Sequence, residues 1–481
     1  MPNQDNSVKG GHFSRELSLL DATAIVVGSM IGSGIFIVSA ETARQVGSPG
    51  WLLVCWLMAG ALTVMAALSY SELASMFPRA GGQYVFLREA YGPLAGFLYG
   101  WTLFTVIQCG TIAAVAVAFA KFLGVFAPGV SQSNVLLALP FWKFSTVQLV
   151  AVGLIVVLTA VNCLSLRTAK VIQTTFTITK VAALAGLILL GLVCWSKFHG
   201  IPVNLTDFWQ PHDVGGNPLT GIKFLGVLGL AMVGALFSCD AWNNITFAGD
   251  EVKNAEKVLP RSLAFGTALV VLLYVLANVV YLLILPMHGT PESASILGRG
   301  ISWATEDRVA TAVAEMIMGS SGQVVMAAAI IISTFGCLNG LILAGPRAYY
   351  AMSRDGLFFK RAGYLNKSTN VPVFGLLLQG LWACLLATSG TYSNLLEYVV
   401  FAALLFYVAT VAAVFVLRCK KKQHDRPYRV PAYPFLPAVY ILFATLVLIG
   451  QICLAPKYCG AGLLIIVSGL PAYFLWRRSN R

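Results

Sequence analysis

The sequence predicts an all-α polytopic membrane protein with twelve transmembrane helices, and three observations support this fold class. Of the 481 residues, 58% are hydrophobic and only 11% are charged, whereas soluble globular domains carry roughly 25% charged residues. Apolar stretches close to the roughly 20 residues that a membrane-spanning helix needs recur along the whole chain. The basic residues concentrate in the loops that would lie on one side of the membrane.

The predicted spans follow one another from residue 19 onward, with mostly short connections between them. They are 19–43, 50–76, 93–123, 146–165, 171–195, 221–248, 262–286, 316–345, 372–390, 393–417, 434–455 and 459–476. Residues 1–18 form a polar segment before the first span, and residues 477–481 form a short tail. Because the first apolar stretch leads directly into a second span, we do not expect it to be a cleavable signal peptide. Residues 19–476 are therefore predicted to form a single transmembrane domain.

The charge distribution predicts the orientation of the chain. If both termini are cytoplasmic, 23 of the 32 Lys and Arg residues lie on the cytoplasmic side, eight lie outside and one, Lys180, lies within a span. Cytoplasmic loops carry an excess of Lys and Arg, so we expect this orientation in the plasma (inner) membrane. The densest basic run, R-C-K-K-K-Q-H-D-R-P-Y-R at 418–429, is interpreted as a topology anchor beside anionic lipids.

Topology thus accounts for the net charge of +13, and no nucleic-acid partner is predicted. The ten cysteines show no C-x-x-C motif and no Cys/His spacing typical of metal sites. We therefore predict neither a metal site nor a cofactor.

The first span contains a stretch that would make a weak helix, G-S-M-I-G-S-G-I-F at 28–36. Each glycine in a helix interior costs about 1 kcal/mol relative to alanine. We predict that the span is broken at Gly28, Gly32 and Gly34. The alternative is that Gly28 and Gly32 form a G-x-x-x-G face for close helix packing. A nucleotide-binding loop is disfavoured, because no Lys follows the glycines and no strand precedes them.

The sixth span has a matching defect, S-C-D-A-W-N-N at 238–244. We predict a helix break at Ser238 and Cys239, followed by Asp240 and Asn243 at membrane depth. Non-helical backbone in a membrane is tolerated only where protein or a water-filled cavity satisfies it. A broken helix at the start of each of two five-helix halves is typical of inverted-repeat transporters, whose substrate lies between the breaks.

Lys180 lies deep within the fifth span, in T-F-T-I-T-K-V-A-A at 175–183. A central lysine costs roughly 2.5–3.5 kcal/mol on insertion scales, so it should face the protein interior and find oxygen partners. Two interpretations stay open: a structural cation that joins helices through carbonyl oxygens, or a fixed or titrating charge at a transport site. The second is favoured, because intramembrane ionisable groups usually mark functional sites.

Other polar and aromatic residues near the spans have two interpretations each. Asn339, in S-T-F-G-C-L-N-G at 333–340, either contacts the substrate region or bridges two helices. Glu72 and Glu251 lie near the inner ends of spans, where they either cap helices or form ion pairs of a cytoplasmic gate. Phe237 and Trp242 are either core aromatics or cover a small ligand beside the broken helix.

Five motifs in register resemble the amino acid–polyamine–organocation superfamily, and within it the chain is most similar to prokaryotic members of the L-type amino acid transporter family. The motifs are residues 28–36, S-E-L-A-S-M-F-P-R-A-G-G-Q-Y-V-F-L-R-E-A-Y-G-P at 71–93, F-S-C-D-A-W-N-N at 237–244, G-D-E-V-K-N-A-E-K-V-L-P-R at 249–261 and R-P-Y-R-V-P-A-Y-P at 426–434. The resemblance runs from about residue 16 to 476. It implies a LeuT-type fold of two inverted five-helix repeats, 19–195 and 221–417, with two further helices at 434–476.

The resemblance also implies that an amino acid binds between the two broken helices. Its carboxylate would accept backbone N–H groups at the positive end of the second half of helix 1, from Ser33, Gly34 and Ile35. Its α-ammonium would contact backbone carbonyls near the breaks, those of Val27, Ile31, Phe237 and Asp240. Backbone groups would then recognise what all amino acids share.

Individual side chains carry further implications of the resemblance. Phe237 matches the aromatic residue that closes over the substrate, and Trp242 and Asn243 match the residues that follow the break. Lys180 matches a lysine that lies near the sodium site of related carriers, so its ammonium would replace that cation. Asp240 stands where the animal branch has glycine and some bacterial serine/threonine exchangers have aspartate, which favours neutral substrates.

One departure from the family concerns the partner protein. Animal members are linked to a glycoprotein through a cysteine between spans 3 and 4, whereas the loop at 124–142 contains none. A disulfide-linked heavy chain is therefore not expected.

The predicted function is sodium-independent exchange of neutral L-amino acids by alternating access. A proton-coupled symporter, with Lys180 losing and regaining its proton, is the alternative. A membrane receptor that binds an amino acid without moving it is a more distant one. An enzyme is not predicted, because Asp240 is the only clearly intramembrane aspartate and a protease would need a pair or an activated nucleophile.

Overall fold

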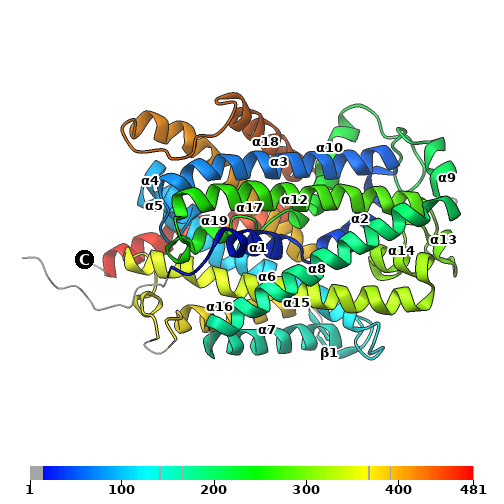
Figure 1. Ribbon diagram of the computed structural model, residues 1–481, viewed down its shortest axis with the longest axis horizontal. Coiled ribbons are helices and arrows are strands. Elements are labelled where there is room, and N and C mark those ends of the chain that lie inside the picture. The colour runs from blue at the N-terminus through cyan, green and yellow to red at the C-terminus, as the bar shows by residue number, and fades with distance from the viewer. Residues whose placement is uncertain are drawn as a thin grey trace, which may run out of the picture.

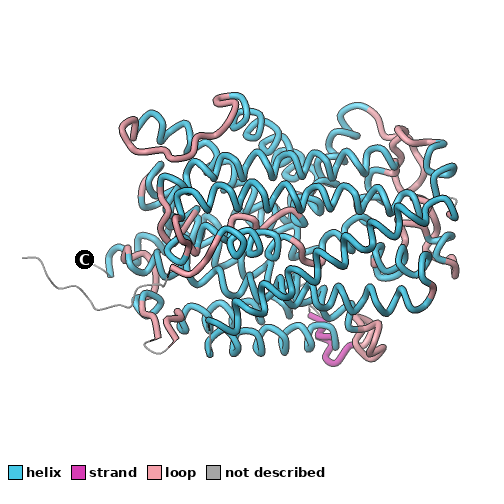
Figure 2. The backbone as a smooth tube through the Cα atoms, in the orientation of Figure 1, coloured by secondary structure: helices cyan, strands magenta, loops and turns pink. Residues whose placement is uncertain are grey.

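The computed structural model describes residues 15–139, 142–164, 166–198, 200–366, 369–389 and 392–479. Most of the predicted N-terminal segment and the last two residues of the predicted tail lie outside the described residues. Long helices run side by side along the long axis of the molecule (Figure 1), and helix dominates the described chain (Figure 2). The prediction of an all-α membrane fold is confirmed.

The first half of the chain forms the first five spans, and two of these are not single regular helices. The membrane helices are α1 (Leu19–Met30), α2 (Gly34–Val46), α3 (Pro49–Met76), α5 (Pro93–Thr102), α6 (Gln108–Leu123), α7 (Thr146–Leu164) and α8 (Leu166–Cys194). A π-helical turn, η1 (Leu103–Ile107), joins α5 to α6. The connections contain α4 (Gln83–Tyr91), the antiparallel strands β1 (Val135–Leu139) and β2 (Trp142–Ser145), η2 (Trp195–Lys197) and α9 (Gly200–Thr206).

The second half begins with another interrupted span and, within the described part of the chain, contains seven long helices. Its long helices are α10 (Gly221–Ser238), α12 (Ala255–Ile284), α15 (Ser320–Arg354), α16 (Val373–Ser389), α17 (Tyr392–Lys420), α18 (Phe435–Leu454) and α19 (Pro456–Ser479). The short elements are α11 (Asn244–Phe247), η3 (Gly249–Glu251), α13 (Ile296–Arg299), η4 (Thr305–Asp307), α14 (Val309–Met318) and η5 (Lys360–Gly363).

The span count agrees closely with the sequence prediction. Among the described residues, 11 helical segments are long and apolar enough to cross a membrane. The remaining predicted span, 372–390, is α16, whose 17 residues are at the lower limit for a spanning helix. The predicted start of the eighth span at 316 is wrong. Gly319 adopts φ 70° between α14 and α15, so the spanning helix begins only at Ser320.

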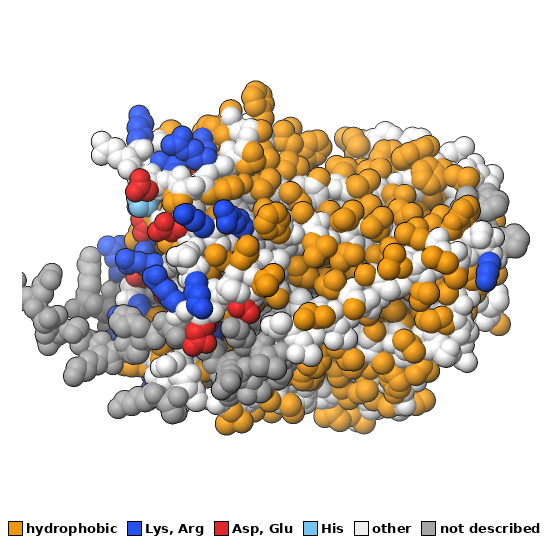
Figure 3. Space-filling view, in the orientation of Figure 1, with side chains coloured by type: hydrophobic (Ala, Val, Ile, Leu, Met, Phe, Trp, Pro, Cys, Tyr) orange, Lys and Arg blue, Asp and Glu red, His pale blue; other side chains and the backbone are white. Residues whose placement is uncertain are grey.

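Charged side chains gather at one end of the molecule, on the left in Figure 3, whereas hydrophobic side chains cover much of the rest of the visible surface. This basic end contains α4 and the C-terminal end of α19, and the opposite end contains α9, α13 and α14 (Figure 1). The distribution is typical of a protein that crosses the membrane with its basic end in the cytoplasm.

The interrupted spans lie in a tightly packed group of helices, because small residues allow close approach. A Cβ atom at Gly60 of α3 would lie 2.4 Å from Val271 of α12, and one at Gly266 of α12 would lie 2.5 Å from Val26 of α1. A Cβ atom at Gly234 of α10 would lie 2.4 Å from Val38 of α2. The two broken helices are thereby held next to each other.

This close packing predicts that Gly60→Leu will destabilise the protein. The added side chain would force α3 away from α12, and such overpacking typically costs about 1–3 kcal/mol. We expect a lower melting temperature in detergent, measured by thermal unfolding with size-exclusion readout. Gly153→Leu in α7 is the matched control, because a Cβ atom there meets nothing within 4 Å. Equal melting temperatures for the two variants would contradict the packing argument.

Candidate substrate site

The first helix break lies at Ile31–Ser33, between α1 and α2. Gly32 is inside the break and Gly34 is the first residue of α2. The predicted break at Gly28 is wrong, because Gly28 is helical within α1. A Cβ atom at Gly28 would lie 2.3 Å from Thr177 Oγ1, so this glycine allows α8 to pack closely against α1. The close-packing interpretation therefore holds for Gly28.

Lys180 contributes the charged donor at the first break. Its side chain is completely buried, with a relative exposure of 0%. The ammonium donates hydrogen bonds of 2.8 Å to the backbone carbonyl oxygens of both Gly28 and Ile31. These carbonyls lie at the C-terminal end of α1, where the last carbonyl groups of an α-helix have no intrahelical N–H donor. Lys180 thus neutralises the negative end of α1 and fixes α8 to the break.

Side chains from two further helices complete the hydrogen bonding of the interrupted segment. Ser333 Oγ of α15 lies 3.3 Å from the carbonyl oxygens of Ile31 and Gly32. Tyr274 Oη of α12 donates to Met30 O at 3.0 Å, and Cys337 Sγ of α15 donates to Ser29 O at 3.2 Å. Every carbonyl from Gly28 to Gly32 therefore accepts from a side chain, as membrane depth requires.

The N-terminus of α2 faces the end of α10, where the second break begins. A Cβ atom at Gly34 would lie 2.2 Å from Ser238 Oγ and 3.0 Å from Ser238 Cα. Only glycine permits this approach of the two backbones. The first N–H groups of an α-helix have no intrahelical acceptors, and the helix dipole makes this end attractive to anions. The N-terminus of α2, formed by Ser33, Gly34 and Ile35, thus lies directly beside the second break.

The second break covers residues 239–243. Ser238 is the last residue of α10 and Cys239 is its C-cap, so the break begins one residue later than predicted. Ala241 adopts φ 64°, a left-handed conformation that is uncommon for residues other than glycine. Helix resumes only for the four residues of α11.

A chain of polar side chains connects the second break to α4 and α17. Tyr407 of α17 donates a hydrogen bond to the Asp240 carboxylate, and its hydroxyl also lies 3.4 Å from Asn243 Oδ1. Asn243 donates to Gln83 of α4 at 3.0 Å, and Gln83 donates to Thr410 of α17 at 3.0 Å. Asn243 is therefore held in place by neighbours on two other elements.

Two adjoining cavities lie beside the second break, and Asp240, Ala403 and Tyr407 line both of them. The first is bounded by the π-helical turn η1 and the start of α6, with Gln108 among its lining residues. π-Helical turns often occur at functional sites. The second is bounded by α3, α17, α18 and Trp242.

The two predicted aromatic residues occupy different places. Trp242 is buried, lines the second cavity, and packs edge-on against Tyr70 at 4.7 Å between ring centroids. Its ring also lies 5.5 Å from that of Tyr407. Phe237 is buried in the last turn of α10 and is not among the described residues that line either cavity.

Asn339 is not among the described residues that line either cavity. Asn162 of α7 donates a hydrogen bond of 2.9 Å to Asn339 Oδ1, and Asn339 is completely buried. Of its two predicted interpretations, the structure shows the bridge between helices α7 and α15.

Ion pairs hold buried carboxylates at the basic end of the molecule. Glu251 accepts from Arg347 of α15, with Arg347 Nη2 at 3.0 Å from Oε2, and Glu72 accepts from Arg418. The backbone carbonyl of Glu251 also accepts the N–H groups of residues 16 and 17 at 2.9 Å. On α4, burial raises the pKa of Glu89, but hydrogen bonds from Lys421 and Arg88 outweigh it and hold that pKa below its usual value.

Several residues of the site were not predicted from the sequence. Tyr407, Gln83 and Thr410 belong to the polar chain, and Tyr274 and Ser333 serve the first break. A hydroxyl in the middle of an apolar span is a signal that points to Tyr407 in the tenth span and to Tyr274 in the seventh. Gln83, Thr410 and Ser333 gave no distinguishing signal, because their partners are distant in the sequence.

Amino acid transporters are among the known proteins whose sequences are similar to this chain. The amino acid permease family profile matches residues 17–459. The chain is 32% identical over 479 residues to the "Large neutral amino acids transporter small subunit 2" of Mus musculus, covering 98% of this chain and 83% of that protein. It is 29% identical over 474 residues to the "b(0,+)-type amino acid transporter 1" of the same species, covering 98% and 89%. It is also 29% identical over 476 residues to the "Serine/threonine exchanger SteT" of Bacillus subtilis (strain 168), covering 98% of each chain.

The polar chain predicts that Tyr407→Phe will weaken substrate binding. The variant keeps the ring beside Trp242 but removes the hydroxyl donor of Asp240. Leaving a buried acceptor without its donor costs about 1–3 kcal/mol, so we expect apparent affinity to fall about fivefold to a hundredfold. Tyr440→Phe is the control: Tyr440 lines the second cavity but shows no side-chain hydrogen bond to the described residues. Affinities that change equally in both variants would contradict the prediction, and equilibrium binding of radiolabelled amino acids would measure them.

Proposed function

Since this chain belongs to the amino acid permease family, we propose that it exchanges neutral L-amino acids across the membrane by alternating access and without sodium. The protein is a multi-pass membrane protein and an amino acid transporter. Its independence of sodium, the neutral charge of its substrate and its orientation in the membrane are what we propose.

The position of Lys180 is the observation that carries the proposal of sodium independence. The ammonium is held by the carbonyls of Gly28 and Ile31 at 2.8 Å each, and Ser333 Oγ lies beside the second of them. Carbonyl and hydroxyl oxygens are the ligands that a hard cation prefers. A permanent cation of the protein at this place removes the need for a dissolved one.

The helix breaks support a site for the common part of an amino acid. We place the carboxylate at the N-terminus of α2, where Ser33, Gly34 and Ile35 supply backbone N–H groups. The α-ammonium would lie towards the second break, near the carbonyls of Phe237 and Asp240. Val27 and Ile31 were also predicted as ammonium ligands, but Ile31 O already accepts from Lys180 and Ser333. An ammonium at Ile31 would therefore have to displace one of these donors.

The charges near the breaks favour a substrate without net charge. Lys180 brings one basic group to the first break, and Asp240 brings one acidic group to the second. Tyr407 and the backbone around Ala241 already hold the Asp240 carboxylate. A zwitterion whose side chain is neutral matches this balance better than a cationic or anionic amino acid does.

We further propose that both termini are cytoplasmic in the plasma (inner) membrane, as the basic end in Figure 3 supports. We also propose that the chain functions without a disulfide-linked heavy chain, because the loop at 124–142 contains no cysteine.

Radiolabelled amino acid uptake into proteoliposomes tests the proposal. Uptake should require a neutral amino acid inside the vesicles, and it should be indifferent to sodium and pH gradients imposed separately. An absolute requirement for sodium would exclude the proposal. Uptake into empty vesicles that follows an inward proton gradient would support the symporter instead. Binding without flux would indicate a receptor.

Lys180→Ala distinguishes a fixed cation from a coupling group. A hydrogen bond to a charged group contributes roughly 1.5–3 kcal/mol, so loss of the ammonium is expected to reduce exchange at least about tenfold. Lys143→Ala, at an exposed position of strand β2, should leave exchange unchanged. If Lys180→Ala kept exchange but abolished proton-driven uptake, Lys180 would be the proton-coupling residue.

A further inference from the structure

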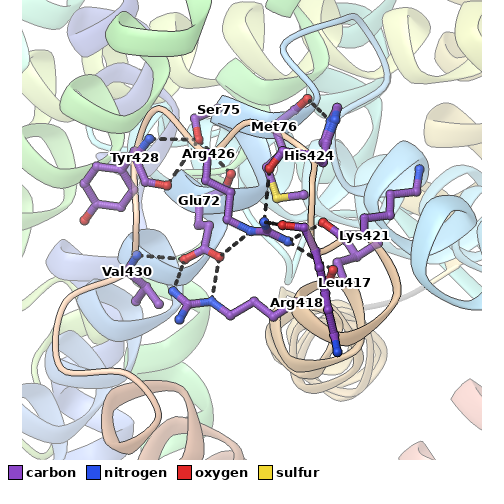
Figure 4. Close-up of polar contacts among 11 residues, drawn as sticks. Glu72, Ser75, Met76, Leu417, Arg418, Lys421, His424, Arg426, Tyr428 and Val430 are labelled. Atoms are coloured by element: carbon purple, nitrogen blue, oxygen red, sulfur yellow. Dashed lines mark hydrogen bonds and ion pairs between the residues drawn. The ribbon is translucent and has the colours of Figure 1, made fainter.

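Glu72, at the inner end of α3, is surrounded by groups from the end of α17 and from the segment that links α17 to α18 (Figure 4). Its side chain is only 1% exposed. Arg418 donates two hydrogen bonds to the carboxylate, from Nε to Oε1 at 2.9 Å and from Nη2 to Oε2 at 2.6 Å. The N–H of Val430 donates to Oε2 at 2.8 Å, and Arg426 Nε lies 3.5 Å from Oε1. We call this arrangement the Glu72 clasp.

The rest of the linking segment is fixed around the clasp (Figure 4). Ser75 of α3 bonds to both backbone groups of Tyr428, at 3.3 Å and 3.4 Å. His424 contacts Met76 O at 3.1 Å, and Arg426 Nη2 donates to Lys421 O at 2.9 Å. Two arginines of the basic run are therefore turned inward, so its interpretation as a lipid-facing topology anchor does not hold for Arg418 and Arg426.

The helices joined by the clasp are the ones that line the second cavity. α3 contributes Leu62, Thr63 and Ala66, and α17 contributes Val400, Ala403, Leu404 and Tyr407. Glu72 lies six residues beyond Ala66, about 9 Å along the helix. Arg418 lies eleven residues beyond Tyr407, about 16 Å along its helix. The clasp thus joins α3 to α17 between the cavity and the cytoplasmic end.

The same segment is also connected to α18, a third helix that lines this cavity. It leads from α17 into α18, and α18 contributes Tyr440 to the cavity. If the inner ends of α3 and α17 separated, a buried carboxylate would lose the two hydrogen bonds from Arg418, which is unfavourable. The clasp therefore favours the arrangement in which the cavity is closed towards the cytoplasm.

We propose that Arg418 and Arg426 are positioning residues for transport: they act through Glu72 to hold α3, α17 and α18 together, and the clasp opens when the site opens to the cytoplasm. The inference rests on the alternating access of the proposed function. It goes beyond that function by assigning the balance between the two accessible states to the R-P-Y-R-V segment at 426–430.

Arg426→Gln tests the proposal with the smallest disturbance, since Arg418 still holds Glu72. Right-side-out and inside-out vesicles give the half-saturation concentrations on the outer and cytoplasmic sides. We expect the cytoplasmic value to fall and the outer value to rise, each about fivefold, which is the effect of about 1 kcal/mol. Arg429→Gln is the matched control: it removes one charge from the same segment, but Arg429 is exposed and makes no side-chain hydrogen bond or ion pair with the described residues.

Labelling of Cys239 provides a readout that does not depend on transport. Cys239 lines the second cavity, and peptide mass spectrometry can follow its modification by a membrane-impermeant maleimide in each type of vesicle. Labelling from the cytoplasmic side should rise in Arg426→Gln and remain at the wild-type level in Arg429→Gln. Glu72→Gln should raise it further, and Arg418→Lys should lie between wild type and Glu72→Gln.

Three outcomes would overturn the proposal: unchanged Cys239 labelling in the clasp variants, the same shift in Arg429→Gln, or equal changes of both half-saturation concentrations. A clasp variant that only melts at a lower temperature, with wild-type labelling, also counts against it. If wild-type vesicles required sodium for uptake but Cys239 labelling still rose in the clasp variants, the proposed sodium independence would be excluded. The proposed role of the clasp would still be supported.

Discussion

The architecture of this transporter depends on satisfying the backbone of an interrupted helix inside the membrane. Carbonyl oxygens in hydrocarbon have no water to bond with, and an unpaired one is costly. From Gly28 to Gly32 each carbonyl accepts from a side chain, and Lys180 supplies the only charged donor among them. Because the donors come from α8, α12 and α15, the break fixes the relative positions of three other helices. The orientation of the α2 N-terminus follows from this arrangement.

The second break is stabilised differently, and the difference matters for function. Here the polar groups belong largely to side chains, and Asp240, Asn243, Tyr407, Gln83 and Thr410 form one chain beside two cavities. In the proposed mode of binding, the first break is the rigid reference point for the part that amino acids share. The second break would then provide the side chains that distinguish one substrate from another.

The sequence was sufficient to predict the fold class, the span order and the presence of both breaks, because these depend on local composition. Asp240, Asn243 and Asn244 cannot face lipid, which located the second break to within one residue. Glycine spacing was less informative: a glycine can end a helix or allow close packing, and Gly28 proved to be helical. Lys180 was recognised because a buried charge is rare. Its carbonyl partners, some 150 residues earlier, and the Glu72–Arg418 pair are set by tertiary packing, which no local pattern encodes.

The ion pairs at the two ends of the molecule differ in strength. At the end of the molecule opposite the basic end, Arg44 pairs with Asp307 at 2.7 Å, with side chains 20% and 34% exposed, and exposed ion pairs contribute only about 0.2–1 kcal/mol. At the basic end, the carboxylates of Glu72 and Glu251 are 1% and 8% exposed and are held by arginines. Removing the partner of such a buried charge is far more costly. With the basic end in the cytoplasm, as proposed, the described conformation is held together more firmly on the cytoplasmic side than on the outer side. In that orientation, a substrate arriving from outside would meet the weaker ion pair first, and its binding energy would have to help break the stronger ones.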